Sequence, residues 1–383
     1  MSEYKTTTTK RKQKKKSSKL PKIILGILIF ILLLICAGLI TVKVLFHLSK
    51  DDPSVPSEFI DVVPDDEFTT ENAGDKSAFD IISEMQGDAD LSSILKDWAT
   101  NSTENSIMYQ ENVINFLLMG IDATGGNSDV IMMVTLNDNT KKIYLTSFMR
   151  DSYTYIQAPN GSSYAKVNAA YGNGGAACLV QTIENDYKIR IDHYVSVNFS
   201  SFSAIVDAIG GVSVPVKQYE AEAMGNLGTW GDNVKLNGEQ ALMYCRIRYC
   251  DSDGDVSRTR RQRQFINALI DRCKELSVSQ LTDVVSMLMP YVKTDCSAGK
   301  IISLGTKALV NRWYEYETVS LTMPAPDFRM DYLGNAWVWI VDYPAAAQYL
   351  QTTIYGETNI KLNADRLTAI DVMRRRQTGT AHP

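Results

Sequence analysis

The sequence predicts an α/β/α sandwich with a central mixed sheet, preceded by one transmembrane helix. Runs rich in β-branched residues alternate with helical patterns from Asn112 onward, as in α/β proteins. The chain is 45% hydrophobic and 22% charged, which is typical of a protein with a buried core and excludes a wholly disordered chain. One apolar stretch near the N-terminus is long enough to cross a bilayer. At about 150 residues per domain, 383 residues correspond to two or three units.

Residues 23–42 are predicted to form the transmembrane helix. They contain no charged side chain, and at about 1.5 Å rise per residue they span about 30 Å, the thickness of the hydrocarbon core. A cleaved signal peptide is the alternative, but its apolar region is usually about 7–15 residues long and precedes a small-residue cleavage site. Lys43 and His47 follow the stretch without such a site, which favours a retained anchor.

The distribution of charge orients the chain in the membrane. Residues 1–50 carry eleven basic side chains and one acidic one, whereas the rest of the chain carries 28 basic and 43 acidic ones. By the positive-inside rule, residues 1–22 form a cytoplasmic basic tail, and we expect a single-pass protein of the cell membrane whose remaining residues are extracytoplasmic. A lysine-rich run can also bind nucleic acid, but beside a span the simpler interpretation is topology plus attraction to anionic lipid. We therefore expect membrane lipid as a partner and no nucleic acid.

The extracytoplasmic part divides into three segments. Residues 43–110 are rich in acids, Ser and Thr and contain prolines, which predicts a stalk. Residues 111–322 carry the alternating strands and helices of the main domain. Residues 323–383 form a C-terminal extension that grows polar beyond Thr353 and is expected to end in a loose tail from Arg374 onward.

The periodicity of apolar residues sets the expected elements. Strands are expected at 113–119, 130–136, 143–147, 193–198, 212–216 and 316–321. Helices are expected at 91–98, 166–187, 199–209, 239–246, 258–276, 281–291 and 301–313, the second of them interrupted by glycines within 172–175. Residues 217–237 contain Gly and Asn and are expected to form a loop that acts as a flap.

An arginine cluster is the strongest chemical signal in the sequence. The segment from 246 to 263 holds no lysine and six arginines: Arg246, Arg248, Arg258, Arg260, Arg261 and Arg263. Arginine carries a planar, permanently charged fork that binds phosphate at two points, so this cluster in an acidic ectodomain predicts an anion site. Arg258 and Arg261 share a helix face because they are three residues apart. Arg260 and Arg263 fall on another side, where we expect them to be solvated.

A helix face neutralised by neighbouring acids is the alternative for this cluster. The acids that would neutralise it are Asp251, Asp253, Asp255 and Glu275. Arg246 and Arg248 are two residues apart, so in extended backbone both side chains point the same way and suit one anion. Arg150 follows an expected strand, and ligands of open α/β sheets bind at strand ends. A surface salt bridge is the alternative for Arg150.

Two aspartates flank a flexible glycine-containing loop. Asp122 follows one expected strand and Asp129 precedes the next. Paired carboxylates beside an arginine-lined anion site suggest a hard divalent cation, Mg²⁺ or Mn²⁺, that shares phosphate oxygens. Turn capping by aspartate is the alternative for both residues.

Several kinds of site are disfavoured. The only histidines are His47, His193 and His382, so a zinc centre with clustered histidines is nearly excluded and a Ser-His-Asp hydrolase would depend on His193. The ATP P-loop, H-E-x-x-H, G-x-S-x-G and dinucleotide-binding motifs are absent.

The cysteines leave disulfide pairing open. Cys36 lies in the predicted span, and the others are Cys178, Cys245, Cys250, Cys273 and Cys296. A disulfide between Cys245 and Cys250, or between Cys273 and Cys296, is possible from the sequence. Zinc is disfavoured because no C-x-x-C spacing exists.

Five segments resemble the LytR-CpsA-Psr (LCP) family of cell-wall ligases and occur in the family's order. They are NFLLMGIDATGGNSDVIMMVTLNDNTKKIYLTSFMRDSY (115–153), KVNAAYGNGG (166–175), IDHYVSVNFSSFSAIVDAIGGVSVPV (191–216), LNGEQALMYCRIRY (236–249) and GDVSRTRRQRQ (254–264). Their combination is highly specific and covers about residues 112–276, and the basic tail, single span and outside domain also suit the family. The sequence departs from the family at Met149, where Pro usually precedes the Arg-Asp pair, and in the cysteines that flank Arg246 and Arg248.

The resemblance implies a membrane-anchored phosphotransferase with an LCP-like catalytic domain at 111–322. Such enzymes take an anionic glycopolymer, for example teichoic acid or capsule, from a polyprenyl-pyrophosphate carrier and attach it to a peptidoglycan hydroxyl. By resemblance, the metal is held by Asp122 and Asp129. The pyrophosphate is bound by Arg150, Arg246 and Arg248. The same site is lined by a polar motif that consists of Asp255, Arg258, Arg261 and Gln262. The expected catalytic residues are Arg150, Arg246, Arg248 and Asp255.

Three questions stay open at the level of sequence. The general base is Asp129 or Asp255, and the transferred glycopolymer and the oligomeric state are not determined. A regulator that binds polyprenyl phosphates without turning them over is an alternative function. A polyprenyl-pyrophosphate phosphatase, with water as the acceptor, is another.

Overall fold

The computed structural model describes residues 89–101, 106–121, 126–225, 227–247, 250–251, 254–275, 292–333 and 337–378. The predicted cytoplasmic tail, the transmembrane helix, most of the stalk and the helix predicted at 281–291 lie outside these residues. Over the ranges just given, no helix has both the length and the apolar character needed to cross a bilayer. The membrane anchor therefore stays a prediction.

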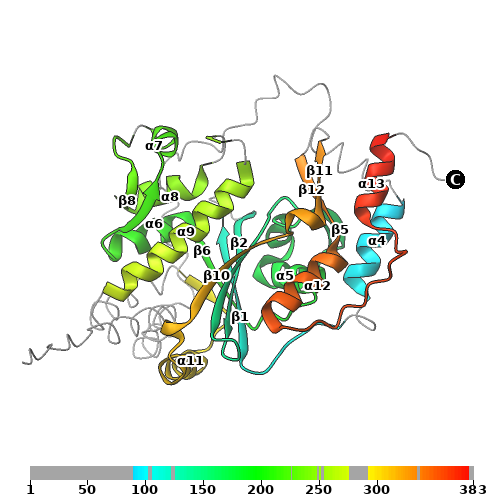
Figure 1. Ribbon diagram of the computed structural model, residues 1–383, viewed down its shortest axis with the longest axis horizontal. Helices are drawn as coiled ribbons and strands as arrows, with labels where there is room; N and C mark the ends of the chain where they lie inside the picture. Colours follow the sequence, from blue (N-terminus) through cyan, green and yellow to red (C-terminus); the bar gives the residue numbers. More distant parts are fainter. Residues whose placement is uncertain are drawn as a thin grey trace, which may run out of the picture.

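A six-stranded mixed sheet forms the centre of the domain (Figure 1). In spatial order its strands are β10 (Glu317–Met323), β3 (Lys142–Phe148), β2 (Ser128–Asn137), β1 (Val113–Ile121), β6 (His193–Asn198) and β9 (Val292–Thr294). β1 pairs antiparallel with β2 and parallel with β6. β3 pairs antiparallel with β2 and parallel with β10. The predicted α/β architecture with a central mixed sheet is confirmed.

Strand direction decides which chain segments meet at each edge of the sheet. Ile121, the last residue of β1 in the ladder, pairs with Ser128 at the start of β2 and with Asn198 at the end of β6. β3 ends at the same edge, where Phe148 pairs with Met323 of β10. We call this edge, formed by the C-terminal ends of β1, β3, β6 and β10, the carboxyl edge.

Apolar residues alternate along β1 and serve a core on each face of the sheet. Leu117 and Met119 belong to the core shared with α5 (Ala169–Tyr187) and α12 (Tyr343–Tyr355). Phe116 belongs to a second core, which includes residues of α9 (Gly254–Glu275) and α11 (Ala298–Asn311). Helices therefore cover both faces (Figure 1).

A smaller unit packs beside α9 around its own apolar core. It consists of α6 (Phe199–Ala208), β7 (Val212–Val216), α7 (Gln218–Ala223), β8 (Gly231–Leu236) and α8 (Gly238–Arg246). The predicted flap at 217–237 is wrong, because this segment forms α7 and β8. β8 pairs antiparallel with β7 and buries Leu236, so the segment contains a paired strand rather than a free loop.

The two ends of the described chain pack together on one side of the domain. α4 (Ala89–Thr100) confirms the short helix predicted at 91–98, but Leu91 is fully buried, so this end of the predicted stalk belongs to the folded body. α13 (Ala369–Thr378) lies against α4 (Figure 1) and buries Met373 completely. The predicted loose tail is therefore wrong up to Thr378, because one face of α13 is apolar and docked.

Short elements complete the described domain. The helix predicted to begin at residue 166 begins at Ala169, because residues 163–166 pair with the strand before them. The glycine interruption is confirmed, since Gly174 and Gly175 leave helical geometry and Gly175 has φ 69°. The remaining elements are β4 (Tyr153–Ile156), β5 (Ser163–Lys166), η3 (Trp313–Glu315), η4 (Pro326–Phe328), β11 (Arg329–Leu333) and β12 (Trp337–Val341).

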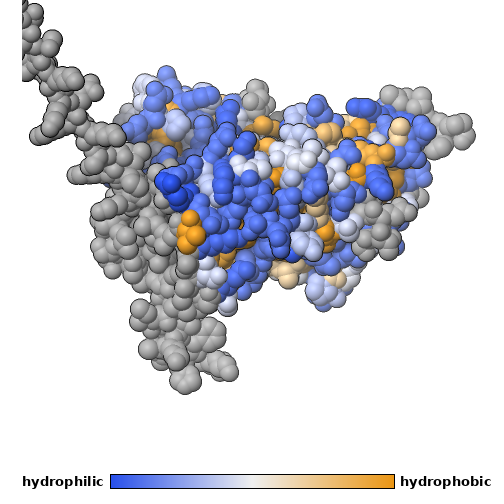
Figure 2. Space-filling model, turned by 60° about the horizontal axis from the view of Figure 1, so that its bottom comes forward, coloured by the Kyte–Doolittle hydropathy of each residue, from blue (hydrophilic) through white to orange (hydrophobic). Residues whose placement is uncertain are grey.

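The surface turned forward in Figure 2 is mostly hydrophilic, with hydrophobic residues in small separate patches. Large exposed hydrophobic side chains lie on different elements, such as Trp230 before β8 and Val310 on α11. Single apolar side chains of this kind are normal on a folded domain.

Candidate active site at the carboxyl edge

The carboxyl edge brings together residues that are far apart in the sequence. Asp129 follows Ser128 at the start of β2, and Arg150 comes two residues after β3 ends. Asp122 lies outside the described residues, but it directly follows Ile121, whose partner in the ladder is Ser128. The end of β1 and the start of β2 therefore lie side by side, as the prediction of paired aspartates requires.

Arg150 is held by two carboxylates. Its Nη1 donates to Asp129 Oδ1, and its Nε lies 3.5 Å from Asp151 Oδ2. The side chains of Arg150 and Asp129 are only 12% and 14% exposed. At this burial the ion pair is shielded from solvent, so it fixes the orientation of the guanidinium more firmly than a surface pair would.

Asp151 links Arg150 to a second cation. Lys166 Nζ, at the end of β5, lies 2.8 Å from Asp151 Oδ1. Burial alone would raise the pKa of the Asp151 carboxyl, but the charges of Lys166, Arg150 and Arg258 outweigh it, so the pKa lies below its ordinary value. Asp151 is therefore ionised and acts as a counter-charge for three cations.

Arg258 belongs to the same group although it lies on α9. Its charge acts on Asp151, and the side chain is 3% exposed. Val256, two residues earlier, packs against the core that contains Met149 and Tyr153. The first turns of α9 thus lie against the segment that carries Arg150.

Arg246 reaches the carboxyl edge from α8. It is the last residue of that helix, and its guanidinium carbon lies 4.7 Å from the centre of the Phe199 ring. Phe199 begins α6 immediately after β6 ends. Cation–π stacking on a partly buried ring helps to hold the arginine in place. Arg248, two residues further on, lies outside the described residues.

Arg261 is fully buried and holds the loop after α8. Its Nη1 lies 3.3 Å from both Glu220 Oε1 and Asp251 Oδ2, and its Nη2 donates to the carbonyl of Ile247 at 2.6 Å. With 0% exposure and these partners, Arg261 holds Ile247 and Asp251, the first of which directly follows Arg246. Its predicted direct contact with pyrophosphate stays a prediction.

The other predicted positions on α9 differ in exposure. Gln262 is 7% exposed and donates to the carbonyl of Cys245 at 3.4 Å, which ties α9 to α8. Asp255 lies in the first turn of α9, and its side chain is outside the described set. Arg260 is solvated as expected, with 38% of its side chain exposed. Arg263 is only partly exposed, and burial, followed by the charge of Arg260, lowers its pKa to about 10.

A divalent cation fits the donor chemistry of this edge. Carboxylate and phosphate oxygens are the ligands that Mg²⁺ prefers. Asp129 Oδ1 pairs with Arg150, while a carboxylate can accept at its second oxygen as well. Since Asp122 lies outside the described residues, the metal site stays a prediction.

Asp151 and Lys166 were missed as members of the site by sequence reasoning. The signal for Asp151 is its position directly after Arg150. Lys166 opens the segment KVNAAYGNGG, but nothing local shows that its ammonium pairs with residue 151. The pairing follows from the β4–β5 hairpin, in which Tyr153 lies opposite Lys166.

The chain is similar to known proteins over about half of its length. The chain is 34% identical over 225 residues to biofilm regulatory protein A of Streptococcus mutans, covering 54% of this chain and 55% of that protein. It is 35% identical over 213 residues to polyisoprenyl-teichoic acid–peptidoglycan teichoic acid transferase TagU of Bacillus mycoides, covering 55% of this chain and 69% of that protein. The match thus spans little more than half the length of the first relative.

A solved structure shares the fold. A crystal structure of a Streptococcus agalactiae protein matches with a TM-score of 0.57 and 26% identity, covering 71% of this chain and 96% of that chain. The model of the LytR_cpsA_psr family matches residues 81–354, well over half of the sequence. These residues include every described member of the carboxyl edge, and we conclude that the chain belongs to the LytR_cpsA_psr family.

Proposed function

We propose that this protein is a membrane-anchored phosphotransferase that moves an anionic glycopolymer from a polyprenyl-pyrophosphate carrier to a hydroxyl of peptidoglycan. The name of the TagU relative, a teichoic acid transferase that acts on peptidoglycan, supports this activity. The anchor is the apolar stretch at 23–42, and the catalytic domain is extracytoplasmic. The polymer is a teichoic acid, a capsule or another anionic glycan.

The grouping of Arg150, Arg246 and Arg258 at the carboxyl edge carries the proposal. They come from the end of β3, the end of α8 and the first turns of α9. The charges of Arg150 and Arg258 both lower the pKa of Asp151. Arg246 stacks on Phe199, the residue that follows β6. Several guanidinium groups at one edge suit the two phosphates of a pyrophosphate. A simple salt bridge at the end of β3 would not require more than one arginine.

The chemical step exchanges one phosphorus–oxygen bond for another. The oxygen of the acceptor hydroxyl bonds to the glycan-linked phosphorus, and the bond from that phosphorus to the bridging oxygen breaks. The electron pair leaves with polyprenyl phosphate, and the hydroxyl proton passes to a carboxylate, Asp129 or Asp255. Arg150 and Arg246 stabilise the negative charge that develops on the phosphate oxygens, a contribution that depends on their being held in place beforehand.

Asp122 and Asp129 would hold Mg²⁺ or Mn²⁺ at this edge. The cation would supply further neutralisation of phosphate oxygens. The protein residues contribute the rest: Asp151 and Asp129 orient Arg150, and Arg261 positions the loop with Arg246 and Arg248.

A regulator that binds polyprenyl phosphates without turnover is the second candidate. The name of the Streptococcus mutans relative, biofilm regulatory protein A, favours it. A phosphatase that uses water in place of the sugar hydroxyl would share the same site. The three functions differ in their products, so one assay separates them.

The test uses the purified full chain in vesicles with a polyprenyl-pyrophosphate-linked glycan, Mg²⁺ and a peptidoglycan fragment. Transfer yields glycan-linked peptidoglycan and polyprenyl phosphate. A phosphatase releases polyprenyl phosphate without an acceptor, and a regulator releases nothing. We expect Arg246→Ala to lower the transfer rate by on the order of 10³-fold and Arg248→Ala to act alike.

Arg375→Ala, an exposed arginine on α13, is the matched control and should leave the rate unchanged. Arg246→Lys keeps the charge but loses the two-point fork, and it should recover only part of the rate. Folding of each variant is checked by its unfolding temperature. Transfer at the wild-type rate by folded Arg246→Ala would show that this edge is not the site.

A further inference from the structure

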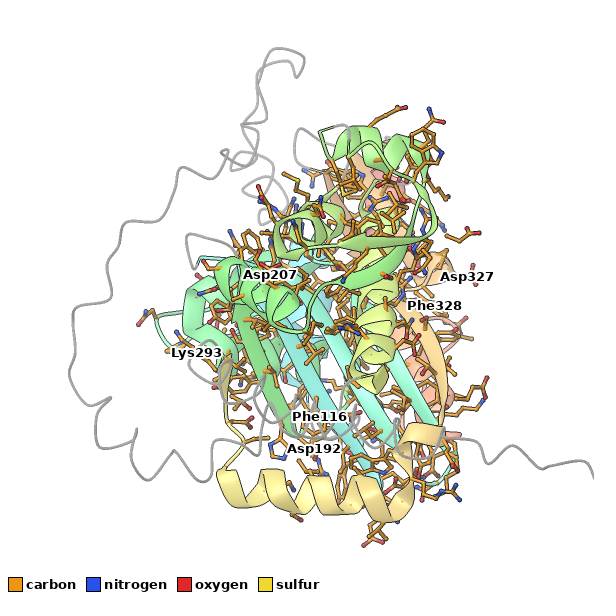
Figure 3. The ribbon with its side chains drawn as sticks, turned by 90° about the vertical axis from the view of Figure 1, so that its left-hand side faces the viewer. Phe116, Asp192, Asp207, Lys293, Asp327 and Phe328 are labelled. Carbon is orange, nitrogen blue, oxygen red and sulfur yellow. The ribbon has the colours of Figure 1, made fainter. Side chains whose placement is uncertain are left out.

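A second group of ligating side chains lies at the opposite edge of the sheet from the arginines. His193 begins β6, whereas Asp295 and Cys296 follow β9. One ligand atom from each of the three lies within 4.8 Å of the others. Figure 3 shows Phe116 and Asp192, the neighbours of His193 by strand pairing and by sequence, at the end of the sheet next to α11.

Strand pairing brings the three side chains together. β6 and β9 are antiparallel, with Val195 opposite Thr294. Continuing that register by two residues sets His193 opposite Cys296, and directly opposed residues have Cβ atoms about 4.5–5.5 Å apart on one face. The face is the one covered by α11, because His193 pairs with Phe116 and their ring centroids are 5.6 Å apart.

The backbone around the group is fixed by hydrogen bonds. Asp295 Oδ1 accepts from the backbone N–H of Tyr194 at 2.9 Å, which directs its Oδ2 toward His193. Thr294 Oγ1 donates to the carbonyl of Tyr194 at 2.6 Å and accepts from the N–H of Cys296 at 3.2 Å. Outer contacts of this kind orient the ligands of metal sites before the ion arrives.

The separation of the ligand atoms matches a tetrahedral metal site. His193 Nδ1 lies 3.4 Å from Asp295 Oδ2. Two ligands bound at about 2.05 Å with a tetrahedral angle are about 3.3 Å apart, and a sulfur bound at about 2.3 Å is about 3.6 Å from either. The nitrogen and oxygen are thus already at the distance of ligands, and the sulfur needs a movement of little more than about 1 Å.

The His193 nitrogen itself points to a ligand. Nδ1 is buried and makes no hydrogen bond with the part of the chain that the structure describes, although Asp295 is close. Buried polar atoms are rarely left without a partner, and such an atom calls for an ion or water at that place. A cation between His193 and Asp295 would satisfy it.

We propose that His193, Asp295 and Cys296 bind one Zn²⁺ ion, with water as the fourth ligand. Nitrogen, sulfur and carboxylate oxygen together select zinc over the hard cations expected at the carboxyl edge. On binding, a zinc–sulfur bond forms and the thiol proton passes to solvent. The thiolate and the carboxylate then balance the two charges of the ion. The ion links β9, an edge strand of the sheet, to β6 and fixes the start of α11.

Cobalt titration of the metal-free full chain tests the proposal without any enzyme assay. We expect a near-ultraviolet thiolate-to-cobalt charge-transfer band that reaches its full intensity with one thiolate-bound Co²⁺ per chain, and Zn²⁺ then removes this band. Cys296→Ser should abolish the band, and His193→Gln should weaken Zn²⁺ affinity by more than about 100-fold, the upper end of the cost of losing an outer-shell partner. Saturating Zn²⁺ should raise the unfolding temperature by about 5 °C in the wild type and not in Cys296→Ser.

Cys178→Ser is the matched control, since Cys178 is also a free cysteine but lies on α5, away from this group. It should keep the cobalt band. A wild-type protein without the band, or a band that survives Cys296→Ser, overturns the zinc site. A disulfide at Cys296 would likewise abolish the band in the wild type, so that result also counts against the proposal.

Discussion

Replacing Arg261 with methionine tests whether this buried arginine stabilises the chain around α7 and the end of α8. The guanidinium is fully buried between Glu220 of α7 and Asp251, and it also holds the carbonyl of Ile247. Methionine keeps much of the volume and removes the charge and every hydrogen bond. Glu220, which is 2% exposed, is then left without the cation that compensates it.

The expected cost follows from that burial. Removing one partner of a buried ion pair typically destabilises a protein by about 3–5 kcal/mol. At about 2–4 °C per kcal/mol for a domain of this size class, the unfolding temperature should fall by about 6–20 °C. Arg260→Met is the matched control one position earlier, because its side chain is 38% exposed and 3.7 Å from the same Asp251. An exposed pair of this kind contributes at most about 1 kcal/mol.

Urea and thermal unfolding of the full chain measure both variants. Adding Glu220→Gln to Arg261→Met should recover part of the loss, because the orphaned carboxylate is then neutral. Equal losses for Arg260→Met and Arg261→Met would refute the reasoning. So would a double variant less stable than the sum of its single changes.

Two further predictions concern the opposite side of the domain. Burial raises the pKa of Asp186 to about 8 from its ordinary 3.8, so the folded chain keeps a proton there that the unfolded chain loses. The free energy of unfolding should therefore fall as pH rises from about 4 to about 8. Urea unfolding measures this pH dependence, and the contribution of Asp186 to it should be absent in Asp186→Asn. Met373→Ala should cost about 2–5 kcal/mol by the same measurement, because this side chain of α13 is fully buried. Exposed Arg375→Ala should be near neutral, and equal losses for the two would mean that α13 is not docked.

The central sheet was predictable because its strands are locally obvious. β1, β2 and β3 are long apolar runs, and each expected range falls inside the observed strand. β8 was missed because its sequence GDNVKL holds only two apolar residues and becomes a strand by pairing with β7. α13 was missed because three consecutive arginines hide the apolar pair Ile370 and Met373, three residues apart on one face.

The sequence identified arginines and aspartates as candidate site residues, whose role in binding stays a prediction, but it did not show their contacts with other residues. Helical spacing placed Arg258 and Arg261 on one face, but it could not show that Glu220 lies opposite Arg261, since that acid is 41 residues away on a segment expected to be a loop. The His193 group depends on β6 pairing with β9, about 100 residues later. No local spacing rule reports such a contact.

The acids of the carboxyl edge explain how several buried arginines coexist before a substrate binds. Like charges placed close together in a low-dielectric environment repel strongly, and each must also be compensated for the water it has lost. Asp129 and Asp151 supply that compensation for Arg150, and Asp151 does so for Arg258 and Lys166 as well. A pyrophosphate brings the same sign of charge as these carboxylates. In the proposed function, a pyrophosphate would therefore bind where the arginines direct donors away from their acids, so that the direction of each guanidinium, more than the number of positive charges, would select the substrate.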